Sequence, residues 1–187
     1  MVATTQDLMV PTEADFYRLP EDGVFEVVHG RAMLLPGHEI PHQDISGALY
    51  EAFRRRLKAR GSGYVFQTVN VFVPPTQRWR GEIQNRVPDL AVSTRHPAKH
   101  FPAGEPPELV IEILSTRRGN VERTEKMDDY ARAGIAEYWI VNPIDRVFEV
   151  YRLQDGDYAL QPVSQLLQPQ AFPGVEIDPQ EIWSILD

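Results

Sequence analysis

The sequence predicts a mixed α/β or α+β fold built as one domain over residues 1–187. Short apolar runs that are typical of strands alternate with two long helical patterns, and this order predicts a mixed architecture. No internal repeat or Gly/Ser-rich linker divides the chain, and 187 residues suit one sizeable core. Residues 1–10 are expected to form a flexible arm.

The first third of the chain predicts a short helix, two strands and a long helix. Thr12 before an acidic first turn predicts a short helix that ends near Leu19. VFEVVHGRAMLL at 24–35 predicts two strands joined around His29-Gly30. From 42 to 59, apolar residues recur every four positions and predict a helix. These residues are Ile45, Leu49, Phe53 and Leu57, and GSG at 61–63 follows them.

The rest of the chain predicts strands around one further long helix. That helix covers 120–133, and Gly134 is placed to be its C-cap. The predicted loops are 74–86 and 95–107. Strands are expected over 64–73, 87–93, 108–115, 136–143 and 146–153, with a hairpin at Asp155-Gly156 and a short helix over 179–186.

Composition narrows the class of protein. No apolar run approaches the ~20 residues of a membrane helix. The N-terminal MVATTQDLMVP lacks a basic region followed by an apolar stretch, so we expect no signal peptide. Cysteine is absent, which excludes disulfides and thiolate metal sites and favours a cytoplasmic location. The net charge of −8 argues against attraction of nucleic acid by the whole surface, but leaves room for a local basic groove.

Three carboxylates interrupt or border apolar strands. Glu112 lies inside ELVIEILS (108–115), where an ionised carboxylate costs several kcal/mol unless it is compensated. Glu26 has similar neighbours, and Asp89 follows Pro88 at a predicted strand start. On adjacent strands, Asp89 and Glu112 could share Mg²⁺ or Mn²⁺, which prefer oxygen ligands. The alternatives are a buried acid paired with arginine for Glu112 and an ordinary Pro-Asp turn for Asp89.

These residues resemble a known family. Pro88-Asp89 followed by Glu112 is similar to the first two elements of the PD-(D/E)XK nuclease signature. More closely, the chain resembles the Uma family of restriction endonucleases over about residues 10–187. The segments that carry this resemblance are FEVVHGRA (25–32), VPDLAV (87–92), ELVIEILST (108–116), KMDDYARAGIAEYWIVNP (126–143) and VFEVYRL (147–153). The resemblance implies a restriction-endonuclease-like core, in which helices flank a mixed sheet.

The third element of the signature departs from its usual form. Leu114 occupies the position of the usual lysine, and Lys126 matches the place on the next helix where the Uma pattern has one. A flexible lysine stem could still deliver its ammonium to a phosphate or to attacking water. From its spacing alone, Lys126 could instead be a solvent-exposed lysine on the helix surface. Glu122 is a secondary candidate, and Glu26 matches an early glutamate of the family that assists the metal.

Two groups of basic residues are candidates for nucleic-acid contact. Arg117, Arg118 and Arg123 bracket the predicted site, and phosphate contact is the functional interpretation. His42 begins the long helix and matches a family histidine, so it could cap the helix or contact phosphate. A solvated surface is the commoner interpretation of the second group, which is Arg54, Arg55, Arg56, Lys58 and Arg60.

Other polar residues carry weaker signals. Ser115 and Thr116 could donate to a phosphate or cap the following turn. His96 and His100 have the spacing of a zinc pair on a helix, but Pro97 makes a regular helix there unfavourable.

The resulting functional hypothesis is a Mg²⁺- or Mn²⁺-dependent endonuclease that hydrolyses DNA. Asp89, Glu112 and Glu26 would hold the metal, and Lys126 would act on water or on phosphate. One alternative is a catalytically weak nuclease-like module for binding or assembly, and another is a hydrolase of a small phosphorylated substrate. DNA is the expected partner. A homodimer or higher homo-oligomer is compatible with the resemblance, because cutting two strands needs two sites.

Overall fold

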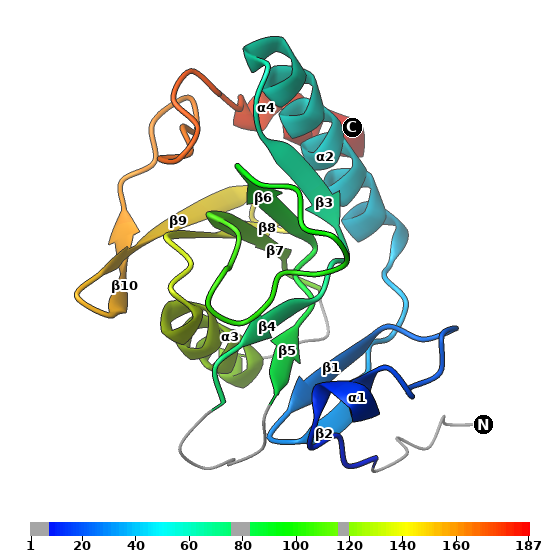
Figure 1. The fold of residues 1–187 in the computed structure, drawn as a ribbon. Helices are drawn as coiled ribbons and strands as arrows, with labels where there is room; N and C mark the ends of the chain where they lie inside the picture. Colours follow the sequence, from blue (N-terminus) through cyan, green and yellow to red (C-terminus); the bar gives the residue numbers. More distant parts are fainter. Residues whose placement is uncertain (1–7, 76–82, 116–119) are drawn as a thin grey trace.

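The computed structural model describes residues 8–75, 83–115 and 120–187, with the backbone alone at 120–123. These residues form the mixed α/β architecture that the sequence predicts, with two sheets and helices around them (Figure 1).

The larger sheet has the strand order β10-β9-β8-β7-β6-β3 within the described residues. Strand β7 pairs with β8 in parallel, with helix α3 between them in sequence, and the other neighbouring pairs are antiparallel. The bounds are β3 Tyr64–Gln67, β6 Leu90–Ser93, β7 Leu109–Ile113, β8 Glu137–Asn142, β9 Val147–Gln154 and β10 Asp157–Gln161.

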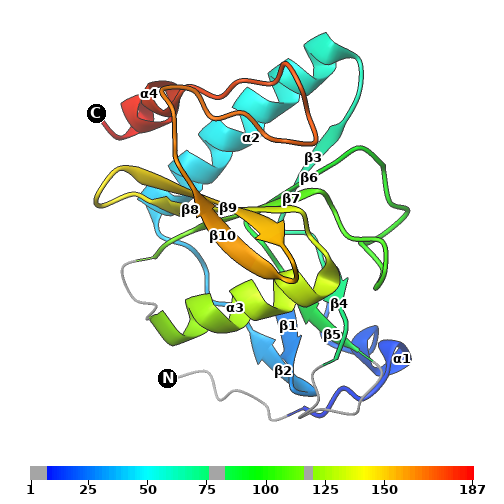
Figure 2. The same ribbon diagram turned by 90° about the vertical axis from the view of Figure 1, so that its left-hand side faces the viewer.

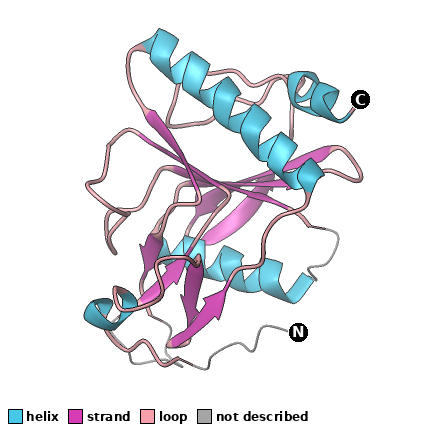
Figure 3. Ribbon diagram, turned by 90° about the vertical axis from the view of Figure 1, so that its right-hand side faces the viewer, coloured by secondary structure: helices cyan, strands magenta, loops and turns pink. Residues whose placement is uncertain are grey.

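The smaller sheet has the order β2-β1-β5-β4 and is antiparallel. It lies on the same side of the larger sheet as α3 (Figure 3). His29 and Gly30, both with positive φ (50° and 75°), form the tight turn between β1 and β2, as predicted. The bounds are β1 Phe25–Val28, β2 Arg31–Leu34, β4 Val71–Val73 and β5 Gln84–Arg86.

Helices cover both faces of the larger sheet (Figure 2). Helix α2 (Ile40–Arg60) packs with α4 (Pro179–Trp183) on one face, around buried Phe53 and Trp139. Helix α3 (Asn120–Ala133) covers the other face with Tyr130, and Gly134 (φ 78°) ends it as predicted. The remaining helices are α1 (Glu13–Phe16), capped by Thr12, and a 3-10 turn at Ser184–Leu186.

Two segments differ from the sequence prediction. The run 64–73 is not one strand, because the backbone turns at Thr68 (φ 51°) and continues as β4 in the other sheet. The predicted loop 74–86 ends in strand β5, whose polar residues are buried. Alternating hydrophobicity could not reveal β5, because its side chains are held by hydrogen bonds and an ion pair instead of by apolar contacts.

Residues 1–7 of the expected arm lie outside the described residues. Met9 forms a β-bridge with Arg31, and Val10 is buried against the smaller sheet. Within the described part of the chain, no helix has both the length and the apolar character needed to cross a membrane.

The packing of the core predicts how much a core substitution lowers the free energy of unfolding. Phe53 is fully buried, and its ring centroid lies 5.7 Å from that of Trp139. We expect Phe53→Ala to lower the free energy of unfolding by about 3–5 kcal/mol, because it leaves a cavity. Urea denaturation measures this loss. Ile144→Ala is the control, because Ile144 is 70% exposed and its loss should cost less than about 0.5 kcal/mol. Equal effects of the two substitutions would contradict this description of the core.

Candidate active site

The strand register places Asp89 and Glu112 side by side. Strands β6 and β7 are antiparallel with Leu90 opposite Ile111, so Asp89 is level with Glu112 at the start of β6. Side chains alternate along a strand, and Leu90 and Ile111 belong to the core under α2. Asp89 and Glu112 therefore face the other side, toward α3. Asp89 Oδ2 also accepts a hydrogen bond from the backbone N–H of Ile113 at 2.7 Å.

Lys126 lies at the centre of this cluster. Its ammonium donates to both carboxylate oxygens of Glu112 at 2.9 Å and lies 3.3 Å from Glu26 Oε1. Lys126 is buried, so the alternative of a solvated helix lysine is excluded. Tyr130, one helical turn further along α3, donates its hydroxyl to Glu112 Oε1 at 2.6 Å. Glu112 is thus compensated by a lysine and a tyrosine, and not by the arginine of the alternative interpretation.

Arg86 joins Glu26 to helix α3. It donates to Glu26 Oε2 at 3.0 Å and to Asp129 Oδ2 at 2.6 Å. Glu26 Oε1 accepts the backbone N–H of Val87 at 3.1 Å, so both oxygens of this carboxylate are engaged. Asp129 also accepts from Gln84 at 2.7 Å. The buried polar residues of β5 therefore hold Glu26 and α3 in place.

Two histidines approach Asp89 from the start of α2. His42 Nε2 lies 3.1 Å from Asp89 Oδ2, and His38 Nε2 lies 3.8 Å from Oδ1. Their rings stack with centroids 3.9 Å apart and an interplanar angle of 6°. His42 Nδ1 is buried and has no hydrogen-bond partner among the described residues. One candidate ligand atom from each of His38, His42 and Asp89 lies within 4.8 Å of the others.

The cluster raises the pKa of one acid and lowers the pKa values of two others. Burial raises the pKa of Glu112 to about 7; Lys126 opposes this shift, while Asp89 and Glu26 add to it. Burial also acts to raise the pKa of Glu26, but the charges of Lys126 and Arg86 outweigh it, so the pKa falls below its ordinary value. The pKa of Asp89 is lowered as well, because contacts with His42 and the N–H of Ile113 outweigh burial.

The pKa of the basic partner, Lys126, is raised as well. Burial disfavours the charged form of Lys126, but the neighbouring Glu112 and Glu26 outweigh burial and raise its pKa above the ordinary value. Lys126 is therefore a permanent ammonium at neutral pH.

The balance of charge fits a divalent cation. Leaving the histidines aside, the described cluster buries four carboxylates, Glu26, Asp89, Glu112 and Asp129, against the two cations Lys126 and Arg86. Asp129 also pairs with the half-buried Arg132, so with every carboxylate ionised one negative charge remains without a cation, which is costly in a buried site. Asp89 Oδ1 lies 3.8 Å from His38 Nε2, which is beyond hydrogen-bond distance. The carboxylate oxygens suit Mg²⁺ and Mn²⁺, whereas the two imidazoles beside Asp89 suit a transition metal such as Mn²⁺ better than Mg²⁺.

The described structure does not test several of the site residues that the sequence predicts. Arg117, Arg118 and Thr116 lie outside the described residues, as do the side chains of Glu122 and Arg123. Leu114 packs against the apolar core on the α3 side. His42 is buried beside Asp89, and its contact with phosphate stays a prediction.

The other basic and histidine candidates have separate partners. His96 contacts the carbonyl of Pro97, whereas His100 contacts the hydroxyl of Tyr17. Arg55 and Arg56 both pair with Glu181 of α4. These two arginines are therefore engaged in packing α2 against α4.

Sequence reasoning missed Arg86, Asp129, Tyr130 and His38. Asp129 and Tyr130 lie three and four residues after Lys126, a spacing that places them on one helix face and could have identified them. His38 precedes His42 by one helical turn, although it lies just before the helix. Arg86 carried no signal, because its neighbours predict a loop.

Comparison with known proteins agrees with this description. Among solved structures, the chain is similar to a protein from Anabaena variabilis ATCC 29413 described as a putative nuclease belonging to DUF820. The TM-score is 0.72 at 19% identity, covering 93% of this chain and 98% of that one, so the two proteins share a fold. The sequence model of the Uma2 family, described as "Putative restriction endonuclease", matches residues 13–180. The chain belongs to this family. Comparison with curated proteins gave no match.

The raised pKa of Glu112 predicts a pH-dependent stability. Folded Glu112 binds a proton up to about pH 7, whereas its ordinary pKa is 4.5. The folded state therefore holds more protons between these pH values, so the contribution of Glu112 is fully present below 4.5 and is lost as the pH rises to 7. We expect the wild type to lose on the order of 3 kcal/mol relative to Glu112→Gln over this range.

Urea denaturation in EDTA at several pH values measures this difference. Glu105→Gln, at an exposed glutamate, is the control and should keep the wild-type pH profile. Parallel profiles for the wild type and Glu112→Gln would show that Glu112 is not protonated in this range.

Proposed function

We propose that this member of the Uma2 family is a metal-dependent endonuclease that hydrolyses DNA phosphodiester bonds. The observation that carries the proposal is the buried ammonium of Lys126, 2.9 Å from both oxygens of Glu112, which is paired in register with Asp89. This arrangement supports a migrated lysine that serves the site from α3 instead of from the strand. The buried excess of carboxylate supports the metal.

Asp89 and Glu112 are the proposed metal ligands, with His38 and His42 as neighbouring imidazoles. A divalent cation held there would supply Lewis-acid polarisation of the phosphate and lower the pKa of a bound water. Glu112 must be deprotonated to bind it, so metal and proton compete for this carboxylate. Glu26 assists by fixing Lys126 and Arg86; its role as a direct ligand stays a prediction.

Lys126 is proposed to orient water and to stabilise negative charge on the phosphate. Because its pKa is raised, it remains protonated and is unsuited to act as the base. In the hydrolysis, a water oxygen forms a bond to phosphorus, and the bond from phosphorus to the departing sugar oxygen breaks. The water proton passes to solvent, and the departing oxygen takes up a proton. A fixed ammonium near the phosphate favours the extra negative charge of the transition state.

A cleavage assay tests this proposal. We expect Mg²⁺ or Mn²⁺ to support DNA cleavage by the wild type, and Glu112→Gln and Lys126→Met each to lower the rate at least about 100-fold. The matched control is Asp128→Asn, an exposed acid on the same helix as Lys126, which should keep the wild-type rate. Cleavage in EDTA, or cleavage indifferent to both substitutions, would refute the assignment and favour a binding module.

Metal binding can also be measured without activity. A cation that binds only the folded state stabilises it, by about 1.4 kcal/mol at ten times its dissociation constant. For a chain of this size we expect the melting temperature to rise by about 3–6 °C in Mn²⁺. Asp89→Asn should remove most of this rise, whereas Asp128→Asn should keep it. An equal rise in the wild type and Asp89→Asn would place the metal elsewhere.

A further inference from the structure

The free edge of β3 carries a groove that the proposed active site does not use. Strand β3 is the last strand of the larger sheet and pairs only with β6 among the described strands. Two hollows lie along it, of about 630 and 450 Å³, and they share Tyr50, Val65 and Phe66. Together they form one continuous depression between α2, β3 and the 95–107 loop, here called the edge groove.

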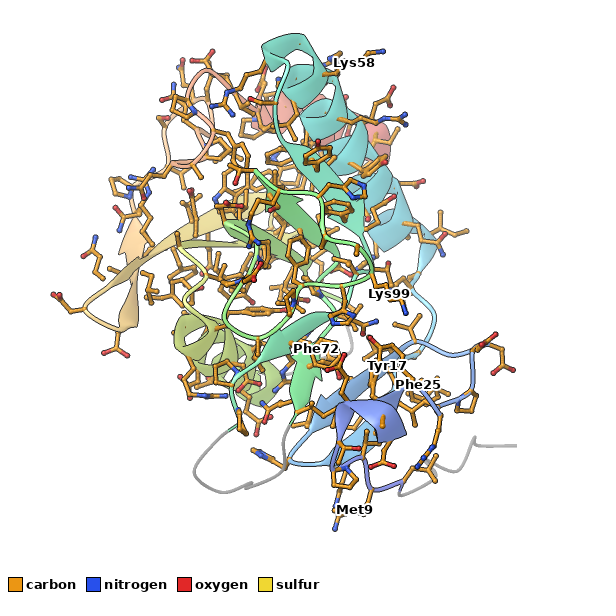
Figure 4. The ribbon with its side chains drawn as sticks, in the orientation of Figure 1. Met9, Tyr17, Phe25, Lys58, Phe72 and Lys99 are labelled. Carbon is orange, nitrogen blue, oxygen red and sulfur yellow. The ribbon has the colours of Figure 1, made fainter. Side chains whose placement is uncertain are left out.

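The charge of the edge groove is opposite to that of the whole chain. The charged side chains that line it in the described structure are Arg54, Lys58 and Lys99, all basic, and no acidic residue lines it. The whole chain carries a net charge of −8. Lys58 and Lys99 lie at opposite ends of this region, one near the end of α2 and the other beside the smaller sheet (Figure 4). A basic channel on an acidic protein is complementary to a polyanion.

Aromatic rings also line the edge groove. Tyr64 is 44% exposed, and its ring stacks near that of Phe66, with centroids 6.3 Å apart and an interplanar angle of 26°. His96 meets both rings edge-on at 5.0 and 5.3 Å. The guanidinium of Arg54 lies 6.0 Å from the ring of Tyr50. Tyr64 and His96 are exposed and Phe66 is half-buried, and such rings between basic side chains match the stacking platforms that bind unpaired nucleobases.

One end of the edge groove is lined by residues that contact the neighbours of the proposed active site. At its near end, the N–H of Thr68 donates to the carbonyl of Asp89 at 3.2 Å, and Gln67 donates to Ser46 at 3.0 Å. Ser46 lies one helical turn after His42, the histidine that contacts Asp89. From His42 to Lys58, α2 rises about 24 Å, which equals about seven nucleotides at the 3.4 Å spacing of one stacked strand.

We propose that the edge groove binds single-stranded DNA that continues from the phosphodiester at the active site. This inference rests on the proposed function, because the bound strand is the flank of the proposed substrate. The basic residues would contact phosphates, while Tyr64 and Phe66 would stack on bases. Paired bases already stack inside a duplex and do not offer their faces, so the rings select the unpaired strand. An extended peptide could pair with β3, but it would not explain why every charged residue of the lining is basic.

Fluorescence anisotropy of a labelled 12-nucleotide single-stranded DNA tests the inference, with the full chain in EDTA so that no cleavage occurs. We expect Tyr64→Ala to weaken binding at least about fivefold through lost stacking, and Tyr64→Phe to bind as the wild type does. The Arg54→Ala/Lys58→Ala variant should reduce the slope of log K against log salt by about 1.4, or 0.7 per lost phosphate contact. Arg146→Gln, in the turn between β8 and β9, removes a positive charge elsewhere and should change binding less than twofold.

Three results would overturn the inference. The first is that a blunt duplex of the same length binds more tightly than the single strand. The second is that the Tyr64→Ala and Arg54→Ala/Lys58→Ala variants both bind the single strand as the wild type does. The third is that polyglutamate displaces the labelled DNA as well as unlabelled DNA does. Circular dichroism of each variant confirms that loss of binding is not loss of folding.

The binding test of the groove and the cleavage test of the proposed function can fail independently of each other. Binding in EDTA reports on the groove, whereas cleavage in Mn²⁺ reports on the active site, so the two measurements on the same variants are independent. Groove-dependent binding without metal-dependent cleavage would refute the proposed function alone. Cleavage that needs Glu112, together with binding indifferent to Tyr64, would refute the groove alone.

Discussion

The buried ammonium of Lys126 ties together the three parts of the structure that build the site. It comes from α3, bonds to Glu112 of the larger sheet, and contacts Glu26 of the smaller sheet. Each carboxylate tolerates burial because of this shared cation, and the cation tolerates burial because of the carboxylates. Removing one member leaves an uncompensated buried charge, so the geometry of both sheets and of α3 depends on the cluster as a unit.

The same cluster explains why the site is suited to bind a further cation. Arg86 satisfies the outer acids, Glu26 and Asp129, whereas Asp89 and Glu112 share a face with too little positive charge. The result is one acid with a lowered pKa beside another with a pKa raised to about 7. Two adjacent acids with pKa values shifted in opposite directions are typical of a functional site such as a set of metal ligands. A purely structural ion pair would have one positive charge for each negative charge. In the proposed function, the edge groove adds the positive charge that the cluster lacks for binding a polyanionic substrate.

The sequence predicted the elements that hydrophobic periodicity controls. The bounds of α3, the hairpin of β1 and β2, and the placement of Glu112 on a strand all followed from local patterns, whereas the strand predicted from residue 87 begins at Leu90, directly after Asp89. Strand β5 did not, because buried Gln84 and Arg86 are stabilised by Asp129, 45 and 43 residues away. Lys126 was found through family resemblance, since its spacing alone suggested a solvated surface. The edge groove was invisible because α2, β3 and His96 meet only in the folded chain.

The central claim is that Asp89 and Glu112 form a cation site that Lys126 completes. Crystals of the protein grown or soaked with Mn²⁺ test it most directly, through anomalous diffraction at a wavelength where manganese scatters strongly. The account predicts an anomalous peak between the carboxylates of Asp89 and Glu112 that disappears in Asp89→Asn crystals. Well-occupied Mn²⁺ bound only elsewhere, with Glu112 still held by Lys126 and Tyr130 alone, would contradict it.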